Sequence, residues 1–141
     1  MTRVDAWFLA RVAADARAAP RAAHDQLTRR LLVAGAAGDV AALRKILARD
    51  VIVVSDGGGA VPVEVTVAHG VEEASWLVAA LLSASRLRLT LAEVNGRCGI
   101  VAHRGKDAVA VVAPETGSDR IAALWVVRNP AKLRAWHRGD A

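Results

Sequence analysis

The sequence predicts an α+β fold in which helices come first and a mainly antiparallel sheet follows. Up to residue 50, apolar side chains recur every three or four positions, which is typical of amphipathic helices. From residue 51 they mostly alternate with polar ones, which is typical of half-buried strands. Because helices and strands are grouped, a repeated βαβ architecture is excluded. With 141 residues, 54% of them hydrophobic, the chain is long and apolar enough for one packed domain.

Three helices are predicted in the first third of the chain. Residues 3–18 are rich in alanine, and a proline two positions later ends that helix. A second helix is expected over 24–34, and a third over 40–47 with Asp39 as its N-cap. The glycine-flanked segment 35–38 joins these two helices into a hairpin.

Two strands and a further helix follow. Residues 51–54 form a short apolar strand, and 61–67 alternate between valine and polar residues. Pro62 lacks an amide hydrogen, so we expect the second strand to lie at an edge of the sheet. The next helix is predicted over 71–83, with two glutamates in its first turn that complement the helix dipole. Its core-facing residues are expected to be Ala74, Leu77 (or Val78) and Leu81.

The rest of the chain is predicted to be an antiparallel meander that ends in a short helix. Asn95-Gly96 is a strong type I′ hairpin signal, and residues 114–119 are expected to form a later turn. Asn129-Pro130 has the pattern of a helix start, and that helix is expected to run through residue 136. The four predicted strands cover residues 87–91, 100–103, 108–113 and 121–128.

Composition excludes several classes of protein. The single cysteine, Cys98, excludes an internal disulfide framework and a multi-cysteine zinc site, and we expect an inert thiol and no cofactor. The longest uncharged helical stretch, 74–85, is too short to cross a bilayer. Charged residues also interrupt the amino-terminal stretch before a signal-peptide core can form. We therefore expect a cytoplasmic protein with no membrane partner.

Positive charge is concentrated at the two ends of the chain. The net charge is +5, with six arginines against three aspartates in residues 1–30 and four basic residues without an acid in 128–138. Basic ends on a nearly neutral body suit an acidic partner or a weak, salt-sensitive contact with nucleic acid. Solvated surface charge in an arginine-rich composition is the simpler interpretation.

Several motifs resemble those of one known family. The motifs are Gly38-Asp39-Val40 with Leu43 and Leu47-Ala48-Arg49-Asp50-Val51, then Val54-Ser55-Asp56-Gly57-Gly58-Gly59, Val94-Asn95-Gly96-Arg97-Cys98-Gly99 and Arg128-Asn129-Pro130-Ala131-Lys132-Leu133. Together, over roughly residues 24–136, they resemble a SnoaL-like domain, which is similar to nuclear transport factor 2. The resemblance is strongest to the domain at the C-terminus of a class of extracytoplasmic-function RNA polymerase sigma factors.

The sequence departs from the family pattern at two positions. Ala60 stands where a basic residue usually follows the glycine loop, and Ala131 replaces the aspartate of the terminal motif. The sigma-factor regions that bind promoter DNA and core polymerase are absent from this chain. We expect residues 1–20 to be a basic helix or linker remnant, too short for a helix-turn-helix unit, and 21–138 to be the SnoaL-like domain.

The resemblance implies a cone-shaped fold, in which a curved antiparallel sheet wraps around the amino-terminal helices and encloses a cavity. It also implies a regulatory role without catalysis, with a sigma-factor module or RNA polymerase as the partner. Other branches of the superfamily catalyse isomerisation, cyclisation or hydrolysis, or bind a small apolar ligand, so the fold does not settle the function. The implied partner-contact residues are Asp56, Gly57, Gly58, Gly59, Asn129, Pro130, Lys132 and Leu133.

The glycine loop has two alternative interpretations besides partner contact. Three consecutive glycines permit close approach of a phosphate, but a phosphate-binding loop needs a lysine and a following helix, and a valine-rich strand follows here. A mobile turn between strands explains the loop equally well.

An enzyme is the main functional alternative. Acid–base catalysis needs a carboxylate or histidine with a pKa shifted by apolar surroundings. The candidates form no recognisable pair, triad or metal-ligand spacing, so no catalytic residue is assigned, although Asp56 or His69 would be the acid–base group. These candidates are Asp56, His69, Glu93 and His103.

A ligand cavity and self-association are two further expectations. Tryptophan side chains can stack on flat ligands in a cavity, although core packing explains Trp76 and Trp125 equally well. We also expect a homodimer, because 61–67 and 108–113 are predicted to leave apolar sheet surface exposed. The candidate cavity residues are His69, Trp76, Asn95 and Trp125.

Overall fold

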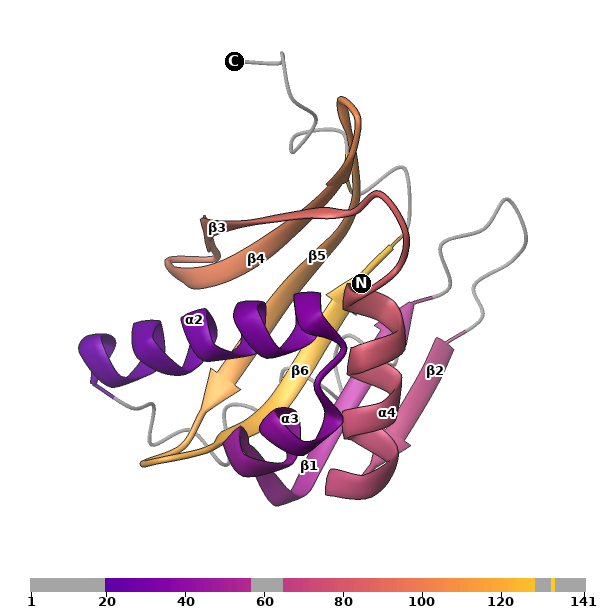
Figure 1. The fold of residues 1–141 in the computed structure, drawn as a ribbon. Helices are drawn as coiled ribbons and strands as arrows, with labels where there is room; N and C mark the ends of the chain where they lie inside the picture. The colour runs from indigo at the N-terminus through magenta and orange to yellow at the C-terminus, as the bar shows by residue number, and fades with distance from the viewer. Residues whose placement is uncertain (1–19, 57–64, 129–132, 134–141) are drawn as a thin grey trace.

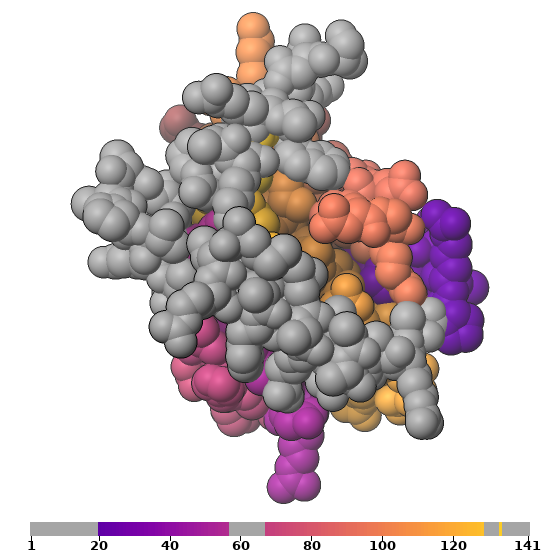
Figure 2. Space-filling model, turned by 180° about the vertical axis from the view of Figure 1, so that it is seen from behind, coloured from indigo at the N-terminus to yellow at the C-terminus, as the bar shows by residue number. Residues whose placement is uncertain are grey.

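A six-stranded sheet with three helices on one face forms the framework of the protein (Figure 1). The computed structural model describes residues 20–56, 65–128 and Leu133. Seen from behind, α2 is visible only at the margin of the molecule (Figure 2). The elements are α2 (Arg21–Ala37), α3 (Val40–Ile46), β1 (Leu47–Asp56), β2 (Val65–His69), α4 (Val71–Leu82), β3 (Arg88–Val94), β4 (Arg97–Arg104), β5 (Asp107–Thr116) and β6 (Ile121–Val127).

The described elements confirm the predicted α+β class and most of the predicted segments. Asp39 caps α3, and its carboxylate accepts a hydrogen bond of 3.0 Å from the amide of Ala42. Asn95 and Gly96 both have positive φ, as a type I′ turn between β3 and β4 requires. None of the described helices has the length and apolar character that a membrane span needs.

The strand order is β2-β1-β6-β5-β4-β3, and it includes one parallel pair. Strands β3 to β6 form the predicted antiparallel meander and β2 pairs antiparallel with β1, whereas β1 and β6 run parallel, the one pair that departs from the antiparallel sheet that the resemblance implies. The reason is non-local: α4 connects β2 at one edge to β3 at the other, and the meander then returns to the middle. The relative direction of β1 and β6 follows from this path and not from a local pattern.

The turn predicted over 114–119 is shorter than expected. Pro114 and Thr116 belong to β5, and the turn lies at 117–120, where the amide of Gly117 donates to the carbonyl of Arg120. Pro114 is tolerated because the ladder between β4 and β5 ends at the Ile100–Val112 pair, so its missing amide hydrogen is not needed there.

Several predictions fall outside the described residues. These include the helix over 3–18, the first part of the strand over 61–67 with Pro62, and most of the helix over 130–136. The described part of that strand, β2, does lie at an edge of the sheet. Leu133 is helical and only 1% exposed.

The main core fills the space between the helices and the sheet. Helix α2 packs against β3, β4 and β5, whereas α4 packs against β1 and β2 (Figure 1). In α4 the predicted Ala74 and the alternative Val78 are buried, whereas Leu77 and Leu81 are only partly buried. The largest fully buried apolar side chains of this core are Leu31, Leu43, Ile46, Leu47, Ile100, Ile121 and Leu124.

Helices α2 and α4 approach each other closely at Gly35. The helix predicted to end at residue 34 continues to Ala37, and Gly38 ends it in the left-handed conformation. A Cβ at Gly35 would lie 2.5 Å from the Cδ1 of Leu82, which is far inside van der Waals contact. Gly35 therefore permits the packing of two helices and does not interrupt the first of them.

His24 connects α2 to the sheet from a fully buried position. Its side chain is 1% exposed, and its Nε2 donates to the backbone carbonyl of Cys98 at 2.8 Å. Its Nδ1 lies 2.8 Å from the hydroxyl of Thr116. Because a carbonyl oxygen can only accept, this geometry assigns the Nε2 proton. One imidazole thus satisfies polar groups at the start of β4 and the end of β5.

We expect His24→Ala to lower the free energy of unfolding by about 3 kcal/mol, because it leaves a buried carbonyl and a buried hydroxyl without their partner. Urea denaturation measures this loss. Gln26→Ala, on the exposed side of the same helix, is the control and should change stability by less than about 0.5 kcal/mol. A loss below about 1 kcal/mol for His24→Ala would contradict the assigned role.

Candidate functional site

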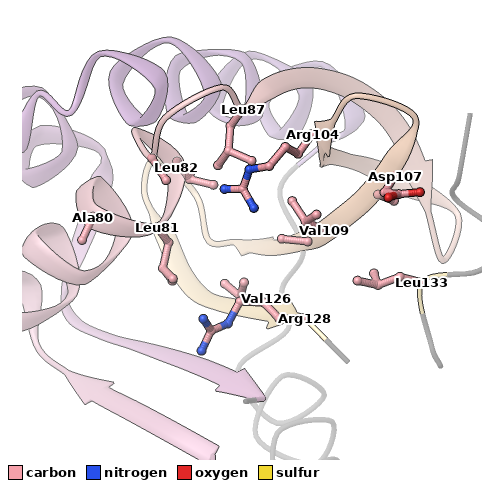
Figure 3. A pocket seen from close by; sticks show the side chains of 13 residues that line it. Ala80, Leu81, Leu82, Leu87, Arg104, Asp107, Val109, Val126, Arg128 and Leu133 are labelled. Atoms are coloured by element: carbon pink, nitrogen blue, oxygen red, sulfur yellow. The ribbon is translucent and has the colours of Figure 1, made fainter. Parts of the chain in front are cut away.

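An apolar pocket of about 590 Å³ opens where α4 ends, next to the hairpin of β4 and β5 (Figure 3). Leu81, Leu82 and Leu87 form the wall on the side of α4. Val109 and Val126 contribute from the sheet. The volume is within the range that small-molecule pockets usually have.

Two arginines and one aspartate also line this pocket. Arg104 ends β4, and Arg128 directly follows β6. In Figure 3 both guanidinium groups point toward the leucines of α4, whereas Asp107 lies farther along the cavity. The site therefore combines apolar walls with an excess of positive charge.

Arg128 is anchored by the end of β1. Its Nε donates to the hydroxyl of Ser55 at 3.1 Å, and its backbone amide donates to the Oδ1 of Asp56. Ser55 and Asp56 are both buried. Since the guanidinium carries five N–H donors and this side-chain bond uses one, Arg128 keeps donors for a further acceptor.

A β-bulge places Val109 in the pocket. Ala102 pairs with Ala110 and His103 with Ala108, so Val109 is the extra residue of β5. Val109 packs with the core under the helices, as its neighbour Ala110 does, whereas Ala108 packs on the other face of the sheet. The bulge thus turns the consecutive side chains of Val109 and Ala110 to the face covered by the helices, and both line the pocket together with Ala108.

The structure gives two of the predicted contact residues roles inside the fold. Asp56 is 6% exposed and its carboxylate accepts a hydrogen bond from the Arg128 amide, so it has a role inside the fold, and its contact with a partner stays a prediction. Leu133 is buried, lines the pocket and packs near Val101 and Val111. The other predicted contact residues lie outside the described part of the chain: Gly57, Gly58, Gly59, Asn129, Pro130 and Lys132.

The predicted cavity residues do not line this pocket. Trp76 is 62% exposed because α4 turns residues 74, 75, 78 and 79 to the core and position 76 to solvent. His69 and Asn95 are exposed at the ends of their strands. Trp125 is half-buried on the face of β6 opposite the helices, beside Ile52 and Val54.

The predicted acid–base candidates are dispersed. Glu93 is exposed and lies 4.0 Å from Arg21, whereas His103 is buried in β4. Neither lines the pocket, so the structure does not bring the four candidates together there. Within the described ranges, no group of three or more His, Cys, Asp or Glu side chains is arranged to hold a metal ion.

The apolar stretch 108–113 is not an exposed surface. Residues 108, 110, 111 and 112 are buried, because β5 is covered by the helices on one face and by a cluster with Val94, Val101 and Leu133 on the other. This corrects one of the two observations behind the expected homodimer. The other, at 61–67, falls mostly outside the described residues, and the dimer stays a prediction.

Two side chains outside the pocket have shifted pKa values. Burial raises the pKa of the Cys98 thiol, and the carboxylate of Asp25 raises it further, which disfavours the reactive thiolate. Burial also raises the pKa of Glu115, with Arg97 and His24 opposing the shift in part. Neither residue lines the pocket.

Sequence reasoning missed the pocket. In the sequence, Arg104 lies between the predicted strands 100–103 and 108–113, and Arg128 begins the terminal motif. No spacing in the sequence connects them, because they reach the pocket from different strands and the bulge at Val109 is not marked by glycine. The signal in the sequence is a basic residue at the end of β4 and another directly after β6, two strands separated by β5.

Comparison with solved structures identifies the fold. No family model matches the chain, and no curated protein matches it in sequence. The extracytoplasmic function sigma factor SigJ of Mycobacterium tuberculosis matches 79% of the chain with 26% identity and a TM-score of 0.59. The match lies in the C-terminal part of SigJ, and the chain spans 44% of its length.

Two other structures are similar in fold at lower identity. An NTF2-like protein of unknown function from Mesorhizobium loti is 18% identical over 76% of this chain and 91% of its own, with a TM-score of 0.56. An LEH-like epoxide hydrolase from M. tuberculosis is 11% identical over 80% of this chain and 87% of its own, with a TM-score of 0.51.

We expect Asp56→Ala to lower the free energy of unfolding by about 2 kcal/mol, because the amide of Arg128 loses its acceptor. Chemical denaturation measures the change. Asp119→Ala, in the exposed turn before β6, is the matched control and should be nearly neutral. Equal stabilities of the two variants would show that the Asp56 contact contributes little.

We expect Glu115→Gln to change the pH dependence of stability. Because burial raises the pKa of Glu115 in the folded state, the folded protein binds this proton more tightly than the unfolded chain does. The free energy of unfolding therefore falls as pH rises from the ordinary pKa of 4.5 through the raised one. Glu115→Gln should remove this part of the fall, whereas the exposed control Glu73→Gln should retain it. Parallel curves for Glu115→Gln and the unmodified protein would contradict the shift.

Proposed function

We propose that this chain is a regulatory interaction domain that binds a sigma-factor module and thereby modulates transcription initiation. The proposal starts from its NTF2-like fold and its similarity to the C-terminal part of a sigma factor. The observation that carries the proposal is the match to SigJ, which covers 79% of the chain at 26% identity. The sigma-factor context belongs to that protein and is extended to this chain as a hypothesis.

The position of the resembling motifs supports the proposal. The segment before the glycine loop and the segment before the terminal motif are 72 residues apart, yet the hydrogen bond between Asp56 and Arg128 joins them. Residues 57–59 and 129–132 therefore depart from neighbouring points at one end of the sheet. We infer that a partner bound there contacts both segments.

The chemistry of the pocket favours binding over catalysis. Acid–base catalysis in such a fold needs a carboxylate or histidine that is kept in apolar surroundings near the reacting atoms. Among the described lining residues, the titratable groups are two arginines and Asp107, and Asp107 is exposed. Arginines bind anions well but do not exchange protons near neutral pH.

A small-molecule binder or enzyme is the second candidate function. The pocket favours it, because a cavity of about 590 Å³ with apolar walls and a few charged groups suits a small ligand. Binding of a ligand alone would support a binder, whereas turnover of a ligand would support the enzyme and overturn the regulatory proposal.

We expect the domain to bind an extracytoplasmic-function sigma factor from the same genome from which any C-terminal extension has been removed. Lys132→Glu should weaken this binding at least tenfold, because it reverses a charge on the proposed contact segment. Isothermal titration calorimetry measures the dissociation constant. Lys45→Glu, an exposed lysine of α3, is the control and should change it less than twofold. No binding by the unmodified domain, or equal effects of the two variants, would contradict the proposal.

A further inference from the structure

We propose that the pocket at the end of α4 binds a small carboxylic acid with an apolar body, whose carboxylate is held by Arg104 and Arg128. This ligand site does not depend on the sigma-factor proposal, since a domain that binds no protein partner can still bind the acid. The argument rests on the walls, the charges and the anchoring of one arginine.

The walls suit an apolar body. Leu81, Leu87 and Val109 are only partly buried although they pack against the main core, so they retain apolar surface that a ligand would cover. Covering apolar surface stabilises a complex by about 25 cal/mol per Å² before the costs of association. A strongly hydrated ligand, such as a sugar or nucleotide, would gain nothing from these walls.

The charges select a single anionic group. Arg104 and Arg128 come from separate strands and line the same cavity. Two guanidinium groups facing one apolar cavity repel each other, and a carboxylate between them relieves this repulsion and offers acceptors to both. Asp107 lines the pocket as well and reduces its formal charge to +1, which matches a monocarboxylate better than a dianion.

Arg128 is positioned before any ligand arrives. Its Nε is bound to the buried hydroxyl of Ser55, and its backbone amide is bound to Asp56. Holding one guanidinium in place lowers the entropy cost of ligand binding. Arg104 is exposed at the hairpin end and supplies the second cation from the other side of the apolar walls.

The test compares ligands that share an apolar chain and differ in the head group. Octanoate, octanol and octylamine are titrated into the full chain, and chemical-shift changes in amide NMR spectra report the dissociation constants and the location. We expect octanoate to bind at least tenfold more tightly than octanol, octylamine to bind more weakly still, and the shifts to cluster at residues 81–87, 104–110 and 126–128. Equal affinity for octanoate and octanol would overturn the proposal, as would shifts elsewhere in the chain.

Variants separate the head-group contact from the walls. Arg104→Gln should weaken octanoate binding at least tenfold and leave octanol unchanged, whereas Leu87→Ala should weaken both ligands similarly. Arg30→Gln, an exposed arginine of α2 outside this pocket, is the matched control and should change neither. Circular dichroism and unfolding curves confirm that each variant is folded. If Arg104→Gln and Arg30→Gln have the same effect on octanoate, the proposed carboxylate site is wrong.

Discussion

The pairing of β1 with β6 is the contact on which the arrangement of the molecule depends. It is the parallel junction between the part that contains α2, α3, β1, β2 and α4 and the part that contains the meander. Its ladder extends to the pair Ser55–Val126, beyond which the hydrogen bond from the Arg128 amide to Asp56 extends the connection. Without this junction the sheet would divide into a two-stranded sheet of β1 and β2 and a four-stranded sheet of β3 to β6. A two-stranded sheet has only marginal stability by itself.

The point at which α4 ends over the sheet explains where the pocket with Arg104 and Arg128 opens. Over most of the sheet the helices pack tightly, with Gly35 against Leu82 and His24 bonded to β4 and β5. Helix α4 ends at Leu82, while the hairpin of β4 and β5 continues to residues 104–107. The apolar side chains beyond the last helical turn therefore have sheet on one side and little helix on the other. The arginines that end β4 and follow β6 lie at this opening.

Local features of the fold could be predicted from the sequence, because their causes are local. Asp39 caps α3, Asn95-Gly96 has the φ angles of its turn, and α4 ends within one residue of its predicted span. The direction of β6 relative to β1, the fit of Gly35 against Leu82 and the tolerance of Pro114 depend on neighbours far away in the chain. The pocket also depends on residues that are distant in the chain, since the bulge at Val109 and the two arginines come together only in the folded structure.

Two residues of the resembling motifs, Asp56 and Leu133, are buried and therefore bear on the fold more than on a partner. Asp56 and Leu133 belong to the motifs that resemble the sigma-factor domains, yet both are used inside the fold, one to anchor Arg128 and one to pack beside Val101 and Val111. Similarity at such positions is required by the fold and says little about a partner. The inference of a sigma-factor partner therefore rests on the extent of the match to SigJ and on the two segments that leave the β1–β6 junction. The carboxylate site rests on Arg104, Arg128 and the leucines of the pocket, so each hypothesis is decided by different residues.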